Sequence, residues 1–496
     1  MHKAAAAQAW RGHTREVQMA QLRWLLANGA RTKWGAERGL KGAGGNGYDA
    51  LRRAVPQVQS YPDVRPLVMR MIEGEADVLW PGVTRRYAQS SGTSDGKSKY
   101  IPITPDSLRV NHYAGGTQAV AQYLRLYPDS RLFAGKALIL GGSYANELTL
   151  PEGVRVGDVS ATLIDCINPL VNLMRVPSKR VALMPDWQTK LPALIDAALK
   201  EDITNISGVP SWFLTVLKGV IEKAGAGTIH DVWPRLEVFF HGGIAMGPYR
   251  DEYARITRRE GMRYIENYNA SEGFFAVQDT VEGPGMLLLI GCGIFYEFIP
   301  VTAAGEPTGE PVAAWEVEEG RVYSLVITSC NGLWRYTPGD TVRIESTDPL
   351  RITVAGRTKS FINAFGEELM VDNAERALTR VCHELDCEIA NYTAAPVYAE
   401  GGRRGRHEWV IEFVRAPRSV DEFAAALDHA LQDVNSDYQA KRAHGIFLDP
   451  LSVVPGRKGV FDAWLASTGR LGGQRKVPRL SNDRHVIDAI LELNKG

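Results

Sequence analysis

Short apolar runs alternate with helical patterns through the middle of the chain, and this alternation limits the fold more than any other feature. Four runs have the length and hydrophobicity of strands, at residues 136–140, 236–240, 286–290 and 323–328. Between the first two, apolar residues at helical spacing predict helices over 189–199 and 212–224. Elements that alternate in this way build a layered domain in which helices cover a sheet. The sequence therefore predicts an α/β fold.

The chain is too long for a single ordinary core. Its 496 residues correspond to two to four domains of about 100–200 residues each. Near residue 340 a Pro-Gly-Asp turn, two short strand-like runs and a second turn at Asp348-Pro349 follow one another, which is typical of a domain boundary. We predict a large N-terminal lobe over 1–345, a hinge region over 346–358 and a small C-terminal lobe over 359–496.

Charge and cysteine content exclude several classes of protein. Lys and Arg together number 57, as do Asp and Glu, so no net field attracts nucleic acid or an anionic membrane. The most apolar window, 286–300, is shorter than the roughly 20 residues that cross a bilayer. The five cysteines form no C-x-x-C pair, which favours a reducing compartment. We expect a cytoplasmic protein without nucleic-acid or membrane partners, whose oligomeric state is open and compatible with a monomer.

A hydroxyl-rich loop is the strongest single pointer to function. Residues 90–99 read Ser-Ser-Gly-Thr-Ser-Asp-Gly-Lys-Ser-Lys. Glycines let the backbone approach phosphate oxygens, while hydroxyl, N–H and ammonium groups donate to them. The spacing between the glycines is one residue too short for a Walker P-loop, so a different type of nucleotide site is predicted. The residues expected to bind phosphate are Ser90, Ser91, Gly92, Thr93, Ser94 and Lys97.

Two segments in the middle of the chain carry groups suited to adenine and to Mg²⁺. One apolar run ends in a glycine pair, and an adenine could lie against bare backbone at Gly243. Further on, Tyr268 offers an aromatic ring, Ser271 a hydroxyl and Glu272 a carboxylate of the kind that binds Mg²⁺. Each segment also has an ordinary structural explanation, because glycine pairs end strands, and buried tyrosines and helix-capping serines are common.

Later segments carry a further carboxylate and two cations. Asp340 lies on a tight turn after Tyr336 and could accept hydrogen bonds from ribose hydroxyls, and Arg357 could complete that ribose site. Lys476 lies on a glycine-flanked basic segment over 472–479. An aspartate turn that closes a hairpin and a basic surface loop are the alternative explanations.

Taken in chain order, these segments resemble the motifs of the adenylate-forming superfamily, which includes acyl-CoA synthetases, luciferases and peptide-synthetase adenylation domains. Residues 268–272 are similar to Y-G-x-T-E, residues 336–340 to Y-x-T-G-D, and Gly356-Arg357 with Lys359 to G-R-x-[DK]. A narrower resemblance is to the plant auxin-responsive acyl acid amido synthetases and their bacterial relatives. It rests on residues 90–94, 267–275, 335–340 and 474–479, with weaker similarity at 27–32 and 55–56.

The sequence departs from the family pattern at three places. Asn269 stands in place of the superfamily glycine, Thr337-Pro338 in place of the usual Arg-Val, and Trp334 where tyrosine is common. None of these changes removes a charged or metal-binding group, so the implied use of ATP is little affected.

The resemblance implies an adenylate-forming, firefly luciferase-like fold, with a large N-terminal α/β lobe and a smaller, mobile C-terminal α+β lobe. It implies ATP and Mg²⁺ as cofactors, and a carboxylic acid and an amino acid as partners. The acid would attack the α-phosphorus of ATP to give an acyl-adenylate, and the amine would then form an amide. The nucleotide would be bound by the loop at Ser90–Lys97 together with Gly243, Tyr268, Ser271, Tyr336, Asp340 and Arg357.

The same resemblance implies catalytic roles for Glu272, which would hold Mg²⁺, and for Lys476, which would stabilise charge on the reacting carboxylate. Val209 and Trp212 occupy the place where family members line the acyl site, and an aromatic acid of the indole or benzoate type would suit them, although core packing explains Trp212 equally well. Two other functions stay open. An acyl-CoA ligase would share the adenylate and differ in the acceptor, and an inactive nucleotide-binding protein would keep the fold without turnover.

Overall fold

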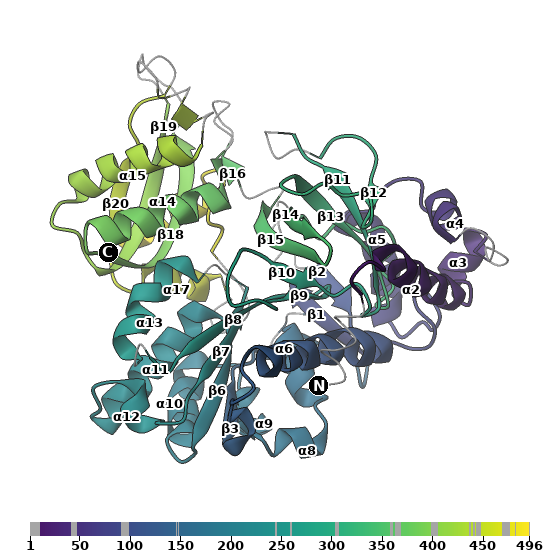
Figure 1. Cartoon of the computed structure of the whole chain (residues 1–496), viewed down its shortest axis with the longest axis horizontal. Helices are drawn as coiled ribbons and strands as arrows, with labels where there is room; N and C mark the ends of the chain where they lie inside the picture. The colour runs from purple at the N-terminus through teal and green to yellow at the C-terminus, as the bar shows by residue number, and fades with distance from the viewer. Residues whose placement is uncertain are drawn as a thin grey trace.

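The computed structural model places the chain in two lobes (Figure 1). Residues up to Arg357 build the large lobe, and residues from Phe361 build the small lobe. None of the described helices combines the length and the hydropathy that a membrane crossing requires. The structure describes residues 10–40, 47–90, 99–144, 146, 148–243, 246–257, 260–302, 307–357, 361–362, 369–397, 405–435, 438–439, 442, 448–468, 477–481 and 483–495.

A 12-stranded sheet forms the centre of the large lobe. Its pairing is parallel from β5 to β8 and antiparallel from β8 onwards, so the turn after β8 lies at the junction of two halves. From edge to edge the strands are β5 (Arg175–Val176), β3 (Lys136–Ile139), β6 (Ile203–Gly208), β7 (Val238–Gly242), β8 (Arg263–Ala270), β9 (Gly273–Val277), β10 (Met286–Leu288), β15 (Leu350–Arg357), β14 (Asp340–Thr347), β13 (Val322–Ser329), β11 (Ile294–Pro300) and β12 (Val312–Ala313).

Helices cover the parallel half of this sheet. One apolar core joins α10, α11 and α13 to β6 and β7, and Phe213, Phe239 and Tyr253 are fully buried in it. The helices of this region are η2 (Leu132–Ala134), α7 (Val159–Asp165), α8 (Pro169–Asn172), α9 (Lys179–Ala182), α10 (Trp187–Ala198), α11 (Pro210–Ala224), α12 (Ile229–Val232), η3 (Gly247–Tyr249) and α13 (Arg250–Ile256).

The N-terminal helices lie beside the antiparallel half (Figure 1). A Cβ on Gly29 would lie 2.3 Å from the Trp334 ring, so the family-like segment 27–32 packs directly against the motif that leads to Asp340. A separate three-stranded sheet has the order β2–β1–β4. The elements are α2 (Thr14–Gly29), α3 (Lys33–Glu37), α4 (Gly47–Ala54), α5 (Tyr61–Ile72), β1 (Arg86–Ser90), β2 (Lys99–Pro102), η1 (Ser107–His112), α6 (Tyr113–Leu126) and β4 (Arg155–Gly157).

The elements predicted for the middle of the chain are confirmed. The four apolar runs form β3, β7, β10 and β13, and the two predicted helices are α10 and α11. Strands β3, β6 and β7 are parallel neighbours separated in sequence by helices, which is the α/β arrangement that the alternation indicated.

The predicted start of a hinge at residue 346 is wrong, because the strand that follows belongs to the large lobe. Strands β14 and β15 form a hairpin in which Thr347 pairs with Leu350, and β15 also pairs with β10. Residues 350–357 therefore continue the central sheet. The large lobe extends to Arg357, in place of the predicted residue 345.

The small lobe contains a three-stranded sheet with helices on both faces and a separate two-stranded sheet. Alternate residues of β19 face different helices, because Trp409 and Ile411 pack with α14 and α15, whereas Val410 packs with α17 and α18. This α+β arrangement agrees with the predicted fold class. The elements are β16 (Phe361–Ile362), β17 (Leu369–Met370), α14 (Val371–Glu384), β18 (Glu388–Val397), β19 (Arg406–Arg415), α15 (Val420–Val434), β20 (Ser452–Gly456), α17 (Val460–Ser467) and α18 (His485–Asn494).

Candidate active site

Neighbouring parallel strands end at one edge of the central sheet, and two of them end in glycine. Strand β6 ends at Gly208 and β7 at Gly242. A Cβ on Gly242 would lie 2.2 Å from the Asn267 carbonyl oxygen, so no larger residue fits there. Gly243 follows with a φ of +84°, a conformation that glycine adopts without strain. Ligands of α/β sheets bind at the carboxyl ends of parallel strands, so this edge is the candidate site.

Tyr268 and Asp340 are 72 positions apart in the sequence and meet beside this edge. The Tyr268 hydroxyl donates to Asp340 Oδ2 at 2.5 Å. Both residues are nearly buried, with exposed fractions of 8% and 5%. Tyr268 lies near the end of β8, and Asp340 begins β14. The structure therefore brings together two residues that the sequence motifs assigned to one nucleotide.

The hairpin of β14 and β15 places two further predicted residues close to Asp340. Arg357 is the direct backbone partner of Asp340 across the hairpin. Tyr336 is fully buried, and its backbone N–H donates to Ile327 O at 2.8 Å, which holds the segment before Asp340 against β13. Three predicted nucleotide-binding positions thus share one end of the antiparallel half.

Ser271 and Glu272 form the turn between β8 and β9, where the parallel half of the sheet meets the antiparallel half. Ala270 and Gly273 pair across this turn. Ser271 and Glu272 are 7% and 6% exposed. The Asn331 side-chain amide donates to Glu272 O at 3.0 Å, which fixes the backbone that carries the carboxylate.

Asn111 holds the same turn from the other side. It lies in the π-helix η1 and is buried. Its Nδ2 donates to Phe274 O at 3.1 Å and to Cys292 O at 2.9 Å, and its Oδ1 accepts from Phe274 N at 2.7 Å. No pattern in the sequence pointed to Asn111, because an asparagine inside a helical pattern matches no motif.

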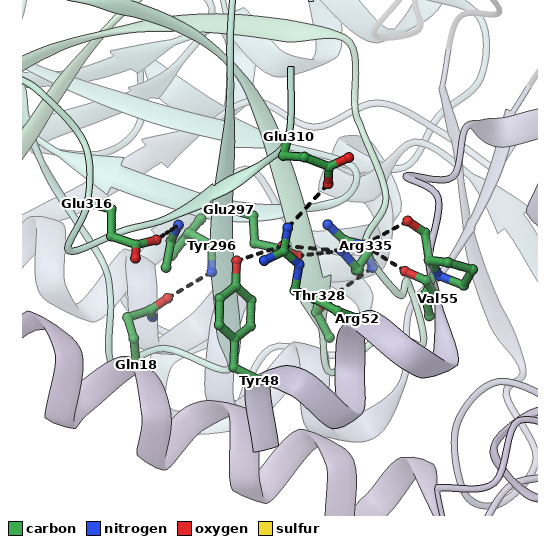
Figure 2. Close-up of polar contacts among 12 residues, drawn as sticks. Gln18, Tyr48, Arg52, Val55, Tyr296, Glu297, Glu310, Glu316, Thr328 and Arg335 are labelled. Carbon is green, nitrogen blue, oxygen red and sulfur yellow. Dashed lines mark hydrogen bonds and ion pairs between the residues drawn. The ribbon is translucent and has the colours of Figure 1, made fainter. Parts of the chain in front are cut away.

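The buried ion pair of Arg335 and Glu297 supports the segment that precedes Asp340 (Figure 2). Arg335 Nε donates to the two Glu297 carboxylate oxygens at 3.2 and 2.9 Å, and each side chain is 1% exposed. Arg335 Nη1 also donates to Val55 O at 2.7 Å. Burial raises the pKa of Glu297, while the hydrogen bond from Arg335 opposes the rise. The family-like residues 55–56 and Arg335, which are distant in sequence, therefore form one contact.

Two buried titratable groups near the strand ends have lowered pKa values. Burial lowers the pKa of His241 in β7 to about 4, and the charge of Arg250 adds to the effect. Burial also lowers the pKa of Lys190 to about 8, although Asp158 opposes the change. Lys190 Nζ donates to Gly141 O at 2.5 Å and so holds the turn after β3. No motif pointed to Lys190, because a lysine in a helical pattern ordinarily lies on the solvated face.

The predicted acyl pocket begins where β6 ends. Val209 precedes α11, Trp212 lies in the first turn of that helix, and both side chains are partly buried. This position at the carboxyl ends of the strands is compatible with the predicted role and also with packing. The assignment of Val209 and Trp212 to the acyl pocket therefore stays a prediction.

Much of the predicted phosphate site lies outside the described residues. Strand β1 ends at Ser90 and β2 begins at Lys99, and these two residues are paired in an antiparallel ladder, so the hydroxyl-rich loop joins the strands of a hairpin. The roles assigned to the loop and to the basic segment stay predictions. The residues concerned are Ser91, Gly92, Thr93, Ser94, Lys97, Lys359 and Lys476, together with the side chains of Ser90 and Arg357.

The fold is shared with adenylate-forming enzymes of known structure. AtGH3.15 acyl acid amido synthetase in complex with 2,4-DB aligns over 99% of this chain and 95% of its own, with a TM-score of 0.81 and 18% identity. A 2-hydroxyisobutyryl-CoA ligase in the postadenylation state aligns over 97% of this chain and 92% of its own, with a TM-score of 0.57 and 12% identity. The chain therefore has the adenylate-forming fold that the sequence predicted.

Family models identify a narrower group. Models of the N-terminal, central and C-terminal domains of the GH3 family match residues 7–189, 287–357 and 372–485, which together make up more than half of the chain. The chain belongs to the GH3 family. Its relatives include a probable indole-3-acetic acid-amido synthetase GH3.1 of Oryza sativa subsp. japonica, 24% identical over 96% of this chain and 88% of that protein. Another is the indole-3-acetic acid-amido synthetase GH3.17 of Arabidopsis thaliana, 22% identical over 93% and 90%.

Proposed function

We propose that the chain is an ATP-dependent acyl acid amido synthetase, which adenylates a carboxylic acid and transfers the acyl group to an amino acid. The contact between Tyr268 and Asp340 carries this proposal, because it joins two adenylation motifs into one site beside the glycine end of β7. The names of the relatives, which are indole-3-acetic acid-amido and acyl acid amido synthetases, support the same reaction.

ATP fits the groups at this site. Bare backbone at Gly243 leaves room for an adenine, and the Tyr268 ring lies on the neighbouring strand. We assign the ribose to Asp340 and Arg357, which are paired across the hairpin. The hydroxyl and ammonium groups between Ser90 and Lys97 would bind the β- and γ-phosphates.

We assign Mg²⁺ to Glu272, where the ion would neutralise phosphate charge. Among the residues that the structure describes, no cluster of three or more His, Cys, Asp or Glu side chains could hold a metal ion. A single carboxylate suits Mg²⁺, because this ion usually takes one or two protein carboxylates and completes its shell with substrate phosphates and water.

The first half-reaction needs no protein nucleophile. The carboxylate oxygen of the acid attacks the α-phosphorus, the bond to the bridging oxygen breaks, and pyrophosphate leaves. Catalysis then rests on positioning and charge stabilisation. We assign to Lys476 the stabilisation of the negative charge that develops on the reacting oxygens. Val209 and Trp212 would hold the acyl group at the carboxyl ends of the strands.

In the second half-reaction an amino acid amine attacks the acyl carbon. AMP leaves, and the nitrogen loses a proton as the amide forms. Lys476 belongs to the small lobe, so its approach to the acyl-adenylate depends on how the two lobes dock. We also place this chemistry in the cytoplasm, because all five cysteines are free thiols, as a reducing compartment favours.

Mass spectrometry of the products tests the proposal. The purified chain is incubated with ATP, Mg²⁺ and a panel of aromatic and aliphatic acids, with either amino acids or CoA as the acceptor. We expect an amide whose mass equals acid plus amino acid minus water, with equimolar AMP and pyrophosphate. A thioester without amide would make the chain an acyl-CoA ligase. Absence of AMP with every acid would refute adenylation.

Removing the Tyr268 hydroxyl should weaken the use of ATP. In Tyr268→Phe, Asp340 loses the donor that orients its carboxylate, and a hydrogen bond to a charged group is worth about 1.5–3 kcal/mol. We therefore expect the KM for ATP to rise by roughly 10- to 100-fold in pyrophosphate-release assays. Tyr323→Phe is the matched control, because it removes a buried hydroxyl that accepts from the Glu318 backbone N–H at 3.0 Å. An equal KM in the two variants would contradict the prediction.

A further inference from the structure

Tyr249 lies in the large lobe and contacts the small lobe. It is the last residue of η3, six positions after Gly243 of the candidate site, and η3 contacts both α14 and β18. Tyr249 is 4% exposed. Its hydroxyl donates to Ala390 O in β18 at 3.2 Å and accepts from Arg479 Nη2 at 3.3 Å. Both of these hydrogen bonds cross the boundary between the lobes. One joins the Tyr249 hydroxyl to backbone, and the other joins it to a cation.

Arg479 is held from several sides within the small lobe. Its guanidinium carbon lies 4.7 Å from the centroid of the Tyr392 ring, and Nη1 donates to Tyr392 O at 3.2 Å. A Glu375 carboxylate oxygen lies 4.0 Å from Arg479 Nε and accepts from the Tyr392 hydroxyl at 2.9 Å. Burial raises the pKa of Glu375, and the charge of Arg479 opposes that rise. The position of the guanidinium is thus fixed by an aromatic face, a carboxylate and a carbonyl.

The backbone around Arg479 is fixed to the edge of β18. The Ala394 N–H donates to Arg479 O at 2.9 Å, and the Ser481 N–H donates to Ala394 O at 3.1 Å. This segment therefore runs beside β18 like an added strand. Lys476 precedes Arg479 by three residues, so the lysine lies on a segment whose C-terminal end is anchored here.

Polar contacts make up other parts of the same lobe boundary. Arg255 in α13 forms an ion pair with Glu388 at the start of β18. A Cβ on Gly247 would lie 3.0 Å from Thr379 Oγ1, so η3 lies close against α14. Hydrogen bonds and ion pairs exchange for water at modest net cost, which suits a boundary that opens and closes.

We propose that Tyr249 and Arg479 form an interlobe latch, and that Arg479 is a positioning residue for Lys476. One guanidinium takes part in both the docking of the lobes and the anchoring of the segment that leads to the lysine, so the two are coupled. When the Tyr249 contact breaks, Tyr392 and Glu375 still hold Arg479 in the small lobe, and the anchor moves with that lobe. The latch rests on the contacts alone, whereas its link to catalysis rests on the proposed function of Lys476.

Hydrogen exchange of the full-length chain tests the latch without any assay of activity. Tyr249→Phe keeps the ring and removes both hydrogen bonds. We expect peptides covering 388–397 and 247–257 to exchange about 3- to 10-fold faster, as the loss of one or two hydrogen bonds implies. Tyr87→Phe is the matched control, because it removes a buried hydroxyl that donates to Thr84 O at 2.9 Å inside the large lobe. Equal exchange of these peptides in both variants and in the wild type would refute the latch.

Separate assays of the two half-reactions test the positioning role. Acid-dependent ATP–pyrophosphate exchange reports adenylation, and amide formation reports acyl transfer. In Tyr249→Phe the ratio of these two rates should change by about 3- to 10-fold, while the KM for ATP stays within about twofold. A purely structural role would lower both rates together, which is the result expected for Tyr87→Phe.

Arg479→Lys provides a second variant should Tyr249→Phe fold poorly. It keeps the charge but loses the planar fork of donors, so the ratio should change in the same direction. An unchanged ratio in an enzyme that adenylates would refute the positioning role. A wild-type chain that adenylates no acid would instead refute the proposed function, and the hydrogen-exchange result would still decide on the latch.

Discussion

Lys476→Ala should reduce acid-dependent pyrophosphate release by about 100- to 1,000-fold, which is the usual effect of removing one preorganised charge-stabilising donor. The dissociation constant for ATP should stay within about twofold of the wild-type value, because the proposed contacts at Gly243, Tyr268 and Asp340 are intact. A coupled pyrophosphate assay at saturating acid measures the first quantity, and calorimetric titration with ATP measures the second.

The control for this experiment is Lys458→Ala. Lys458 is exposed and precedes α17 in the same lobe, so its loss changes the net charge of the small lobe equally without touching the proposed site. Pyrophosphate release at near the wild-type rate in Lys476→Ala would remove that lysine from its assigned role. A large loss in both variants would point to a general effect of charge.

Arg335→Met should cost about 3–5 kcal/mol of unfolding free energy, because it leaves the Glu297 carboxylate buried without its cationic partner. Urea unfolding of the large lobe, followed by tryptophan fluorescence, measures the loss. Arg343→Met is a matched control in β14, because Arg343 is exposed and its Nη1 donates to Gly320 O in a surface contact. We expect a change of at most about 0.5 kcal/mol there.

A double variant of the ion pair tests the cause of the loss in stability. Adding Glu297→Met to Arg335→Met removes the stranded charge, so much of the stability should return. If the double variant were as unstable as Arg335→Met, lost packing around the guanidinium would explain the effect, and the unpaired carboxylate would not.

The loss in Arg335→Met should also depend on pH. Burial raises the pKa of Glu297 and Arg335 opposes the rise, so removal of Arg335 lifts that pKa further above its value in the unfolded chain. A folded state with the higher pKa binds the proton more tightly, so its stability is greatest below the pKa of the unfolded chain and falls as the pH rises from there through the folded pKa. The difference between Arg335→Met and the wild type should therefore be smaller at pH 5 than at pH 8.

Sequence motifs predicted a set of site residues, because adenylation demands particular groups in a particular order, and the roles of those residues stay predictions. Tyr268 and Asp340 were assigned to one nucleotide from their motifs, and the structure places them in contact. Asn111 could not be found in this way. Its partners Phe274 and Cys292 lie 163 and 181 positions away, and only the folded sheet makes them neighbours.

The misplaced boundary has a similar cause. Residues Asp348-Pro349 close a hairpin between Thr347 and Leu350, and turn-forming residues mark hairpins and domain linkers alike. The pairing of β15 with β10 shows that this turn closes a hairpin and is not a domain linker. That pairing joins strands that are remote in the sequence. Local patterns predicted the strands and helices of the middle region, whereas the partner of each strand depended on the whole fold.

Strand β15 also decides where the chains of two relatives can be recombined. It lies between β14 and β10, so a hybrid joined at residue 346 would take β15 from one parent and both of its neighbours from the other. Side chains selected in different proteins would then meet within one sheet, next to Asp340. A junction after Arg357 keeps that sheet from a single parent. The small lobe becomes an exchangeable module at that junction, and differences among relatives in acceptor choice can be traced to one lobe or the other.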